Sequence, residues 1–208
     1  MSTYWARAQY DNVVLSQSPA VVLEYENFQD GMPPQWVGPF WQAPLAQTAT
    51  INGERVLRHP SIAQRDVYTL SGATYNPGYG ALWNQVFECR VRPIAYEAMG
   101  EASFGLLARY MNEGSLVYVK ARANGHLELI SRSLRGGEMV LDSTKAPLAL
   151  NKWHTLRIEA TDLNLRVYLN GRFVLQGFDP APNEMGGRYG VLSTNAHVHF
   201  YDCLAQLP

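Results

Sequence analysis

Short runs in which apolar and polar residues alternate recur along most of the chain, and this alternation limits the fold more than any other feature. In residues 153–160, for example, Leu156, Ile158 and Ala160 would share one face of a strand, and the residues between them are polar. Such a strand belongs in a sheet with one buried and one solvated face. No long window has the spacing of an amphipathic helix. The pattern therefore predicts an all-β protein.

The predicted strands are short and are separated by turn residues, which the 17 Gly and 12 Pro of the chain supply in quantity. Many short strands at regular spacing are typical of a sandwich or a barrel. The segments expected to be strands are residues 12–15, 20–25, 55–58, 66–70, 82–92, 103–110, 116–123, 126–132, 138–141, 153–160, 163–169, 173–175, 189–193 and 198–204.

Two Asn-Gly pairs lie between alternating runs, Asn124-Gly125 and Asn170-Gly171. Asn and Gly both tolerate the positive φ that a type I′ turn needs at its two central positions. Each pair predicts a tight antiparallel hairpin.

Charge and hydropathy exclude several classes of partner. The 17 Lys and Arg nearly balance the 18 Asp and Glu, for a formal net charge of -1, so the basic footprint of a nucleic-acid-binding protein is missing. No stretch approaches the length of a membrane span, and the start of the chain carries arginine where a signal peptide needs an apolar core. We expect no nucleic-acid partner and no membrane insertion.

The chain is expected to form a single domain over residues 1–208, since no linker or low-complexity tract divides it. Residues 1–16 are a separate question, because Tyr10-Asp11 and Tyr201-Asp202 stand at the same offset before an apolar stretch. Residues 1–16 are either the tail strand of a preceding module or a short extension with a chance similarity. A free strand there could also mediate self-association.

Cys89 and Cys203 are the two cysteines of the chain. Their number and spacing match neither a disulfide framework nor a zinc site. The favoured interpretation is two buried thiols that pack as small apolar side chains. The alternative is one bridge between an early strand and the last.

Aromatic and charged residues in two regions suit a sugar ligand. The apolar face of a pyranose ring stacks on aromatic rings, and its hydroxyls take hydrogen bonds from charged side chains. The alternative is that the aromatic rings pack in the core and the charged groups form a solvated face. The candidate ligand-binding residues are Tyr75, Tyr79, Trp83, Arg109, Tyr118, Lys120 and Glu128.

The order of motifs resembles the concanavalin A-like lectin and glucanase superfamily, in particular its laminin-G-like modules. The acidic-Phe-x-Asp-Gly start is matched at residues 26–31, and Trp36 follows. The resemblance implies a two-sheet antiparallel jelly-roll sandwich, and such folds host both binding modules and enzymes. The other matching stretches are residues 104–110, 116–129, 153–158, 165–171, 187–191 and 198–203.

The same resemblance implies a structural calcium ion. Its relatives hold Ca²⁺ with an acidic residue of the opening strand and an Asp of the closing strand, and these positions correspond to Glu26 and Asp202. Asn27 stands where relatives tend to carry a second acid. Glu26 and Asp202 could equally be ordinary carboxylates at strand ends.

Catalytic patterns of the superfamily are weak in this chain. The Glu-x-Asp-x-x-Glu run of the laminarinase-like glycosidases is missing, and only the loose cluster of Glu24, Glu26 and Asp30 supplies neighbouring carboxylates. The lyase-like pattern keeps its Tyr-x-Lys strand at residues 118–120 but lacks its Gln-x-His strand. His197 and His199 could hold zinc only with a third ligand.

The sequence therefore predicts a non-catalytic, lectin-like carbohydrate-binding module with a glycan partner and a structural calcium ion. It would act outside the cell or on a cell or virion surface, although no signal peptide is visible in this chain. The first alternative is a structural or adhesive surface subunit that uses the same fold for protein contacts. The second is a glycoside hydrolase or polysaccharide lyase with unrecognised catalytic residues.

Overall fold

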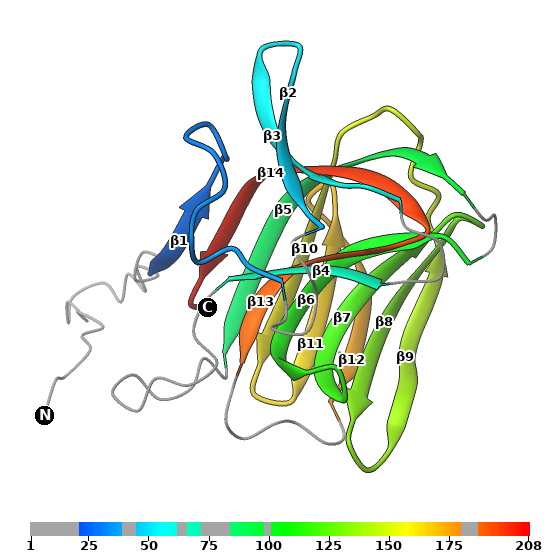
Figure 1. Ribbon diagram of the computed structural model, residues 1–208. Coiled ribbons are helices and arrows are strands. Elements are labelled where there is room, and N and C mark those ends of the chain that lie inside the picture. The colour runs from blue at the N-terminus through cyan, green and yellow to red at the C-terminus, as the bar shows by residue number, and fades with distance from the viewer. Residues whose placement is uncertain (1–20, 39–44, 62–65, 72–83, 98–100, 180–186) are drawn as a thin grey trace, which may run out of the picture.

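The computed structural model describes residues 21–38, 45–61, 66–71, 84–97, 101–179 and 187–208. This part of the chain forms two antiparallel sheets that stack as a sandwich (Figure 1). The predicted all-β class and two-sheet architecture are confirmed. In the described ranges, no helix has the length and hydropathy to cross a membrane.

Sheet A has eight strands, and its centre is formed by the two longest, β5 (Gln85–Tyr96) and β14 (Ala196–Gln206). The strand order runs β12 (Arg172–Phe178), β11 (Asn164–Leu169), β10 (His154–Thr161), β5, β14, β3 (Glu54–His59), β2 (Gln47–Ile51), and β1 (Val22–Glu26) pairs with β14 beside this path.

Sheet B has six strands and lies across from sheet A. Its order is β4 (Asp66–Ser71), β13 (Arg188–Thr194), β6 (Ser103–Asn112), β7 (Ser115–Arg122), β8 (His126–Ser133) and β9 (Gly137–Lys145). The order places β13 between β4 and β6, so strands from both ends of the sequence meet in this sheet.

The core fills the space between the two sheets. Phe87 of β5, Phe104 of β6 and Phe200 of β14 are completely buried there. Phe28 and Trp36 close the core next to β1, with their rings 5.2 Å apart in an edge-on contact. Alternation along each strand supplies these inward residues, and it leaves every second side chain on an outer face.

Most predicted strands appear with shifted ends, one strand was not predicted, and one predicted strand is not tested. Residues 47–51 form β2, which the sequence analysis left out, and residues 12–15 lie outside the described part of the chain. The turn at Asn170-Gly171 has positive φ at both residues, as predicted. At Asn124-Gly125 only Gly125 has positive φ, and its N–H donates to Arg122 O, so this hairpin has a three-residue loop instead of a type I′ turn.

Cys89 of β5 and Cys203 of β14 form a disulfide, so the favoured interpretation of two free thiols is wrong. Both residues lie in the core on neighbouring strands. Buried cysteines can be either free thiols or a disulfide. Here two adjacent strands bring the side chains close enough for a bridge.

Candidate functional site

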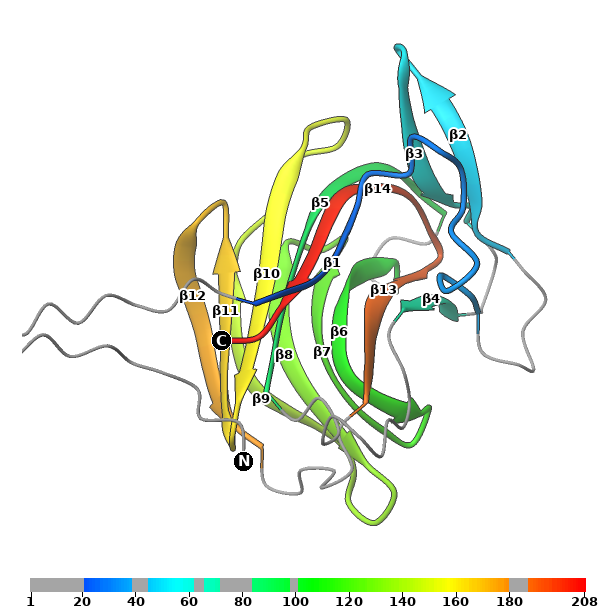
Figure 2. The ribbon, with the colours of Figure 1, turned by 90° about the vertical axis from the view of Figure 1, so that its left-hand side faces the viewer.

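The outer face of sheet B is concave. Figure 2 shows β6, β7 and β8 bending so that the face turned away from sheet A is hollowed, and Figure 1 looks onto this face. On β7, Val117 and Val119 point into the core, and alternation therefore places Tyr118 and Lys120 on the opposite side. We call this outer surface the concave face.

The floor of the concave face is apolar. Its side chains come from five of the six strands of sheet B and form a cluster separate from the core between the sheets. An apolar floor beneath polar groups is common in ligand sites. The cluster consists of Tyr68, Leu70, Leu107, Tyr110, Leu116, Tyr118, Ile130 and Leu192.

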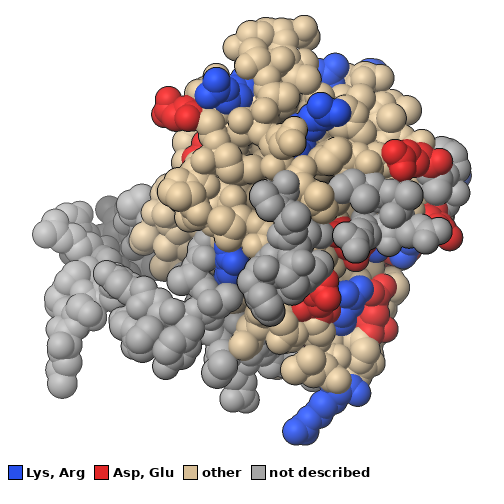
Figure 3. Space-filling view, in the orientation of Figure 1, with Lys and Arg blue, Asp and Glu red and all other residues tan. Residues whose placement is uncertain are grey.

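Charged side chains surround this floor. Figure 3 shows basic and acidic side chains interspersed on the concave face. A hollow there joins residues of β4, β7, β8 and β13, and its lining residues are Asp66, Tyr68, Leu116, Tyr118, Lys120, Arg132 and Leu192.

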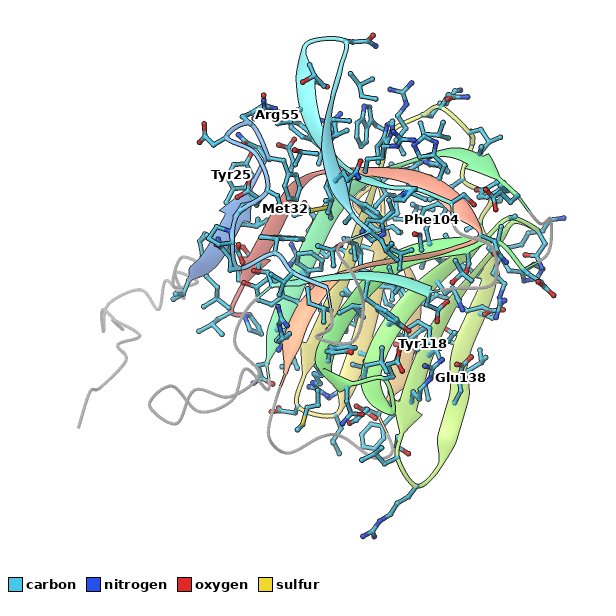
Figure 4. All side chains as sticks on the ribbon, in the orientation of Figure 1. Tyr25, Met32, Arg55, Phe104, Tyr118 and Glu138 are labelled. Carbon is cyan, nitrogen blue, oxygen red and sulfur yellow. A yellow bond between two sulfur atoms is a disulfide. The ribbon has the colours of Figure 1, made fainter. Side chains whose placement is uncertain are left out.

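Tyr118 lines this hollow, is itself buried, and lies between two cations. The guanidinium carbon of Arg132 is 5.5 Å from the centre of its ring, and the Lys120 ammonium is 5.8 Å from it. Arg132 also donates to the Tyr118 hydroxyl over 3.2 Å and forms an ion pair with Glu138. In Figure 4, Tyr118 and Glu138 lie close together on this face.

Burial sets the protonation of these groups. It raises the pKa of Tyr118, which therefore stays a neutral phenol at physiological pH. Burial alone would also raise the pKa of Glu138, but hydrogen bonds from Arg132 and Tyr118 bring that pKa below its usual value. Burial lowers the pKa of Lys120, an effect that Asp66 partly opposes. Among the described residues, Lys120 forms no ion pair.

Glu128 shares the concave face with Lys120, since the two residues are cross-strand partners in the pairing of β7 with β8. Its carboxylate accepts a 2.6 Å hydrogen bond from Arg122. Three of the predicted ligand residues, Tyr118, Lys120 and Glu128, are thus brought together on one face.

Arg109 does not join them, which corrects the prediction that it projects beside Tyr118. A bulge in β6 gives Arg109 a positive φ and turns its side chain inward, where it is 1% exposed. The guanidinium forms an ion pair with Asp179 over 3.4 Å and donates to the backbone carbonyl of Asp162. Strict alternation would have placed this residue outward, and the extra residue of the bulge reverses it.

Tyr75, Tyr79 and Trp83, the aromatic candidates of the Gly/Pro stretch, lie outside the described residues.

Glu24 of the predicted acidic cluster is held in place by four hydrogen bonds. Its Oε1 accepts from Trp36 Nε1 over 2.6 Å and from Gln35 Nε2 over 3.2 Å. Its Oε2 accepts from the hydroxyls of Ser71 and Tyr189, each over 2.6 Å. This carboxylate therefore ties β1 to β4 and β13.

Glu26 and Asp202, the predicted calcium pair, are engaged by other groups. Asp202 accepts from the Tyr25 hydroxyl over 2.8 Å and from Arg90 over 3.2 Å, and Glu26 accepts from the N–H of Phe28. A Ca²⁺ ion at Asp202 would compete with the positive charge of Arg90, so in this arrangement the two carboxylates do not fit a shared calcium site. Calcium binding stays a prediction.

His197 and His199 lie on one face of β14, with their Nε2 atoms 3.2 Å apart. In the ranges that the structure describes, no group of three or more His, Cys, Asp or Glu could hold a metal ion.

Four residues of the concave face were not among the predicted site residues: Asp66, Tyr68, Arg132 and Glu138. The Tyr68 hydroxyl donates to Asp66 over 3.0 Å, and both residues lie on β4, which β13 and β6 separate from β7. Alternation within residues 66–70 and 126–132 could have assigned Asp66, Tyr68 and Arg132 to an outer face. Only the strand order brings them to the same hollow.

No protein-family model and no curated protein matches the chain. Solved structures do match. The carbohydrate-binding module CBM66 from Bacillus subtilis has a TM-score of 0.58 at 18% identity, over 77% of this chain and 91% of the module. A protein of unknown function with a galectin-like fold, also from Bacillus subtilis, has a TM-score of 0.62 at 11% identity, over 90% and 96% of the two chains.

The β-glucanase of Bacillus licheniformis has a TM-score of 0.61 at 9% identity, and the match covers 92% of this chain and 100% of the enzyme chain. Identities this low establish a common architecture and leave activity open. Together with the two antiparallel sheets, these similarities show that the chain has the concanavalin A-like jelly-roll fold.

Proposed function

We propose that this protein is a non-catalytic carbohydrate-binding module that holds a glycan on the concave face, outside the cell or on a cell or virion surface. The observation that carries the proposal is the set of charged groups on this face, in which Lys120 and Arg132 flank the buried ring of Tyr118. The apolar side chains are buried beneath the charged groups and hold them in place, and the hydroxyls of a sugar ring can take hydrogen bonds from those charged groups.

The similar structures support a sugar ligand, since one is named as a carbohydrate-binding module and another as a glucanase. The carboxylates of the concave face favour binding over hydrolysis. Asp66 accepts from Tyr68, Glu128 from Arg122 and Glu138 from Arg132. A glycosidase needs one carboxyl group kept protonated as an acid, whereas hydrogen bonds from Arg132 and Tyr118 bring the pKa of Glu138 below its usual value and keep it ionised.

A structural or adhesive subunit is the second candidate, and β1 is the observation that favours it. Val22, Leu23 and Tyr25 are 57%, 38% and 56% exposed, a run of apolar surface on a strand beside β14. Exposed apolar strands often mark protein contacts. This candidate predicts self-association, which the first does not require.

The test is a glycan array with the full chain in calcium and again in chelator, followed by calorimetric titration of each ligand found. Lys120→Gln should weaken the binding of that ligand about tenfold, because a charge-assisted hydrogen bond contributes about 1.5–3 kcal/mol. Lys145→Gln, an exposed lysine on β9 of the same sheet, is the matched control and should bind like the parent.

Loss of binding in chelator would support the prediction of a calcium ion, and unchanged binding would contradict that prediction. A blank array with a folded chain, or equal effects of the two lysine variants, would contradict the glycan proposal. A blank array together with concentration-dependent sedimentation would favour the structural subunit.

A further inference from the structure

The outer face of sheet A carries a row of basic side chains at the end of the sandwich where β3, β14 and β5 run side by side. His199 of β14 is the cross-strand partner of both Arg58 of β3 and Arg92 of β5. Direct cross-strand partners have their Cβ atoms about 4.5–5.5 Å apart, so the three side chains form one continuous row. We call it the basic row.

Within the described residues, no carboxylate pairs with this row. Among the described residues, neither Arg58 nor Arg92 forms an ion pair, whereas Arg90 on the same face is paired with Asp202. Like charges on neighbouring strands destabilise a sheet, so two unpaired arginines flanking one histidine cost stability unless an anion joins them.

Two buried atoms of the row also have no hydrogen-bond partner within the described structure, Nε of Arg92 and Nδ1 of His199. His199 is 3% exposed, so its free ring nitrogen is not satisfied by open solvent. Buried polar groups are nearly always hydrogen-bonded in native proteins. Arg58 Nε donates to His197 Nε2 over 3.0 Å, so His199 Nε2 donates to the same atom and neutral His199 presents Nδ1 as an acceptor. An oxyanion could therefore accept from Nε of Arg92 directly, and from Nδ1 of His199 once that imidazole is protonated.

An aromatic ring lies beside the row. The guanidinium carbon of Arg92 is 6.0 Å from the ring centre of Trp153, which in turn is 6.1 Å from the ring of Tyr201. Arg90, itself paired with Asp202, lies against the same indole, 5.2 Å from its ring centre. An aromatic ring beside Arg92 suits a sugar ring that carries a negative group, because the two rings can pack together while the anion pairs with Arg92.

We propose that the basic row, with Trp153, is a second binding site that takes an acidic sugar through its carboxylate or sulfate. This site lies on the sheet opposite to the concave face, and it does not depend on the function proposed for that face. The shared chemistry is an oxyanion on a sugar ring, and uronate and sulfated sugars are its two sources.

The first experiment is calorimetric titration of the full chain at pH 6 with three oligosaccharides of equal length: a neutral glucan, a polyuronate and a sulfated galactan. Inorganic sulfate is the fourth ligand. We expect binding of an acidic oligosaccharide that survives Lys120→Gln, because Lys120 lies on the other sheet. Arg58→Gln and Arg92→Gln should each weaken this binding about tenfold, as the loss of one charge-assisted hydrogen bond predicts.

Arg166→Gln is the matched control, since Arg166 is an exposed arginine on β11 of the same sheet. The Arg166→Gln variant should bind the acidic oligosaccharide as tightly as the parent does. Equal losses in Arg166→Gln and Arg92→Gln would show attraction by net charge alone and would overturn the proposal. So would binding of inorganic sulfate without an acidic oligosaccharide, or the absence of all anion binding. Comparison of the polyuronate with the sulfated galactan identifies the source of the anion.

A second readout follows the imidazole of His199 by NMR. Burial, and then His197, Arg92 and Arg58, lower its pKa to about 4. An anion seated between the two arginines should raise this pKa toward its ordinary value, because it offsets their charge. An unchanged pKa at saturating oligosaccharide would place the ligand elsewhere.

Discussion

At the scale of single residues, buried His59 should make stability depend on pH. It is completely buried in sheet A, with Nδ1 3.1 Å from Ser193 Oγ and Nε2 2.8 Å from Thr69 Oγ1. Burial lowers its pKa to about 3, whereas in the unfolded chain the imidazole has its ordinary pKa of 6.5. Between these values the unfolded state binds more protons, so the free energy of unfolding should fall as pH falls, by up to about 1.4 kcal/mol per pH unit.

Urea unfolding at pH 7, 6, 5 and 4 measures this slope. His59→Gln lowers stability at pH 7 but removes one titrating group, so its slope between pH 6 and 4 should be shallower than that of the parent. His199 also has a lowered pKa and keeps part of the slope in the variant. Identical slopes for parent and variant would mean that His59 does not titrate as its burial requires.

Residue-level prediction from the sequence succeeded where alternation was regular and failed where it was interrupted. Tyr118, Lys120 and Glu128 follow uninterrupted alternation and share the concave face as expected. Arg109 follows a bulge, and no residue type in the sequence marks that extra position. Its partner Asp179 is 70 residues away in the chain, so the buried ion pair could not be anticipated from local pattern.

At the scale of elements, Glu24 should hold β1 against the sandwich. The carboxylate accepts from Trp36 and Gln35 on one oxygen and from Ser71 and Tyr189 on the other. Glu24→Gln removes the negative charge and replaces one carboxylate oxygen by an amide NH₂. This NH₂ group would face hydrogen-bond donors of the neighbouring side chains and could not accept from them. The expected loss of stability is about 2–4 kcal/mol, since hydrogen bonds to a charged group contribute about 1.5–3 kcal/mol each and not all four would be lost.

Hydrogen exchange resolved by residue is the decisive measurement for this strand. In Glu24→Gln, the amides of β1 should exchange faster, while those of β7 and β8 should change only with global stability. Asp30→Asn, an exposed acid in the following turn, should leave β1 unchanged. Uniform acceleration over the whole chain would mean that Glu24 supports the fold generally and does not anchor β1.

The elements themselves could be predicted closely because their alternation is local, and the exception is instructive. β2 has the sequence QTATI, in which small and polar residues obscure the alternation. It is joined to β3 by Asn52-Gly53, both with positive φ. This is the same hairpin signal that was used at Asn170-Gly171, so turn chemistry could have identified β2 where side-chain hydropathy could not.

At the scale of the whole molecule, the two faces could not be derived from the sequence. The hollow needs β4 beside β13, two strands separated by more than half of the chain, and the basic row needs β3 and β5 on opposite sides of β14. Local pattern says which side chains share a face of one strand, but it does not give the order of strands in a sheet. Resemblance to a known fold supplied the architecture, and the chemistry of each face had to come from the structure.

The disulfide should contribute to the stability of the whole sandwich, because it joins the two central strands of sheet A across 114 residues of sequence. Closing a loop of that length lowers the entropy of the unfolded chain, by about 4–5 kcal/mol at most in the chain-entropy model. For a protein of this size, about 1 kcal/mol shifts Tm by about 2–4 °C, so reduction should lower Tm by up to about 8–20 °C.

Thermal unfolding in oxidised and reduced buffer, with thiol counting in the denatured state, tests this expectation. Cys89→Ala with Cys203→Ala should unfold near the reduced parent and should not respond to reductant, which separates the loss of the bridge from other effects of the reagent. Two free thiols counted in the oxidised protein would show that Cys89 and Cys203 are not bridged. An unchanged Tm after complete reduction would mean that the packing of β5 against β14 alone holds the ends of the sequence together, and that the bridge only follows from their proximity.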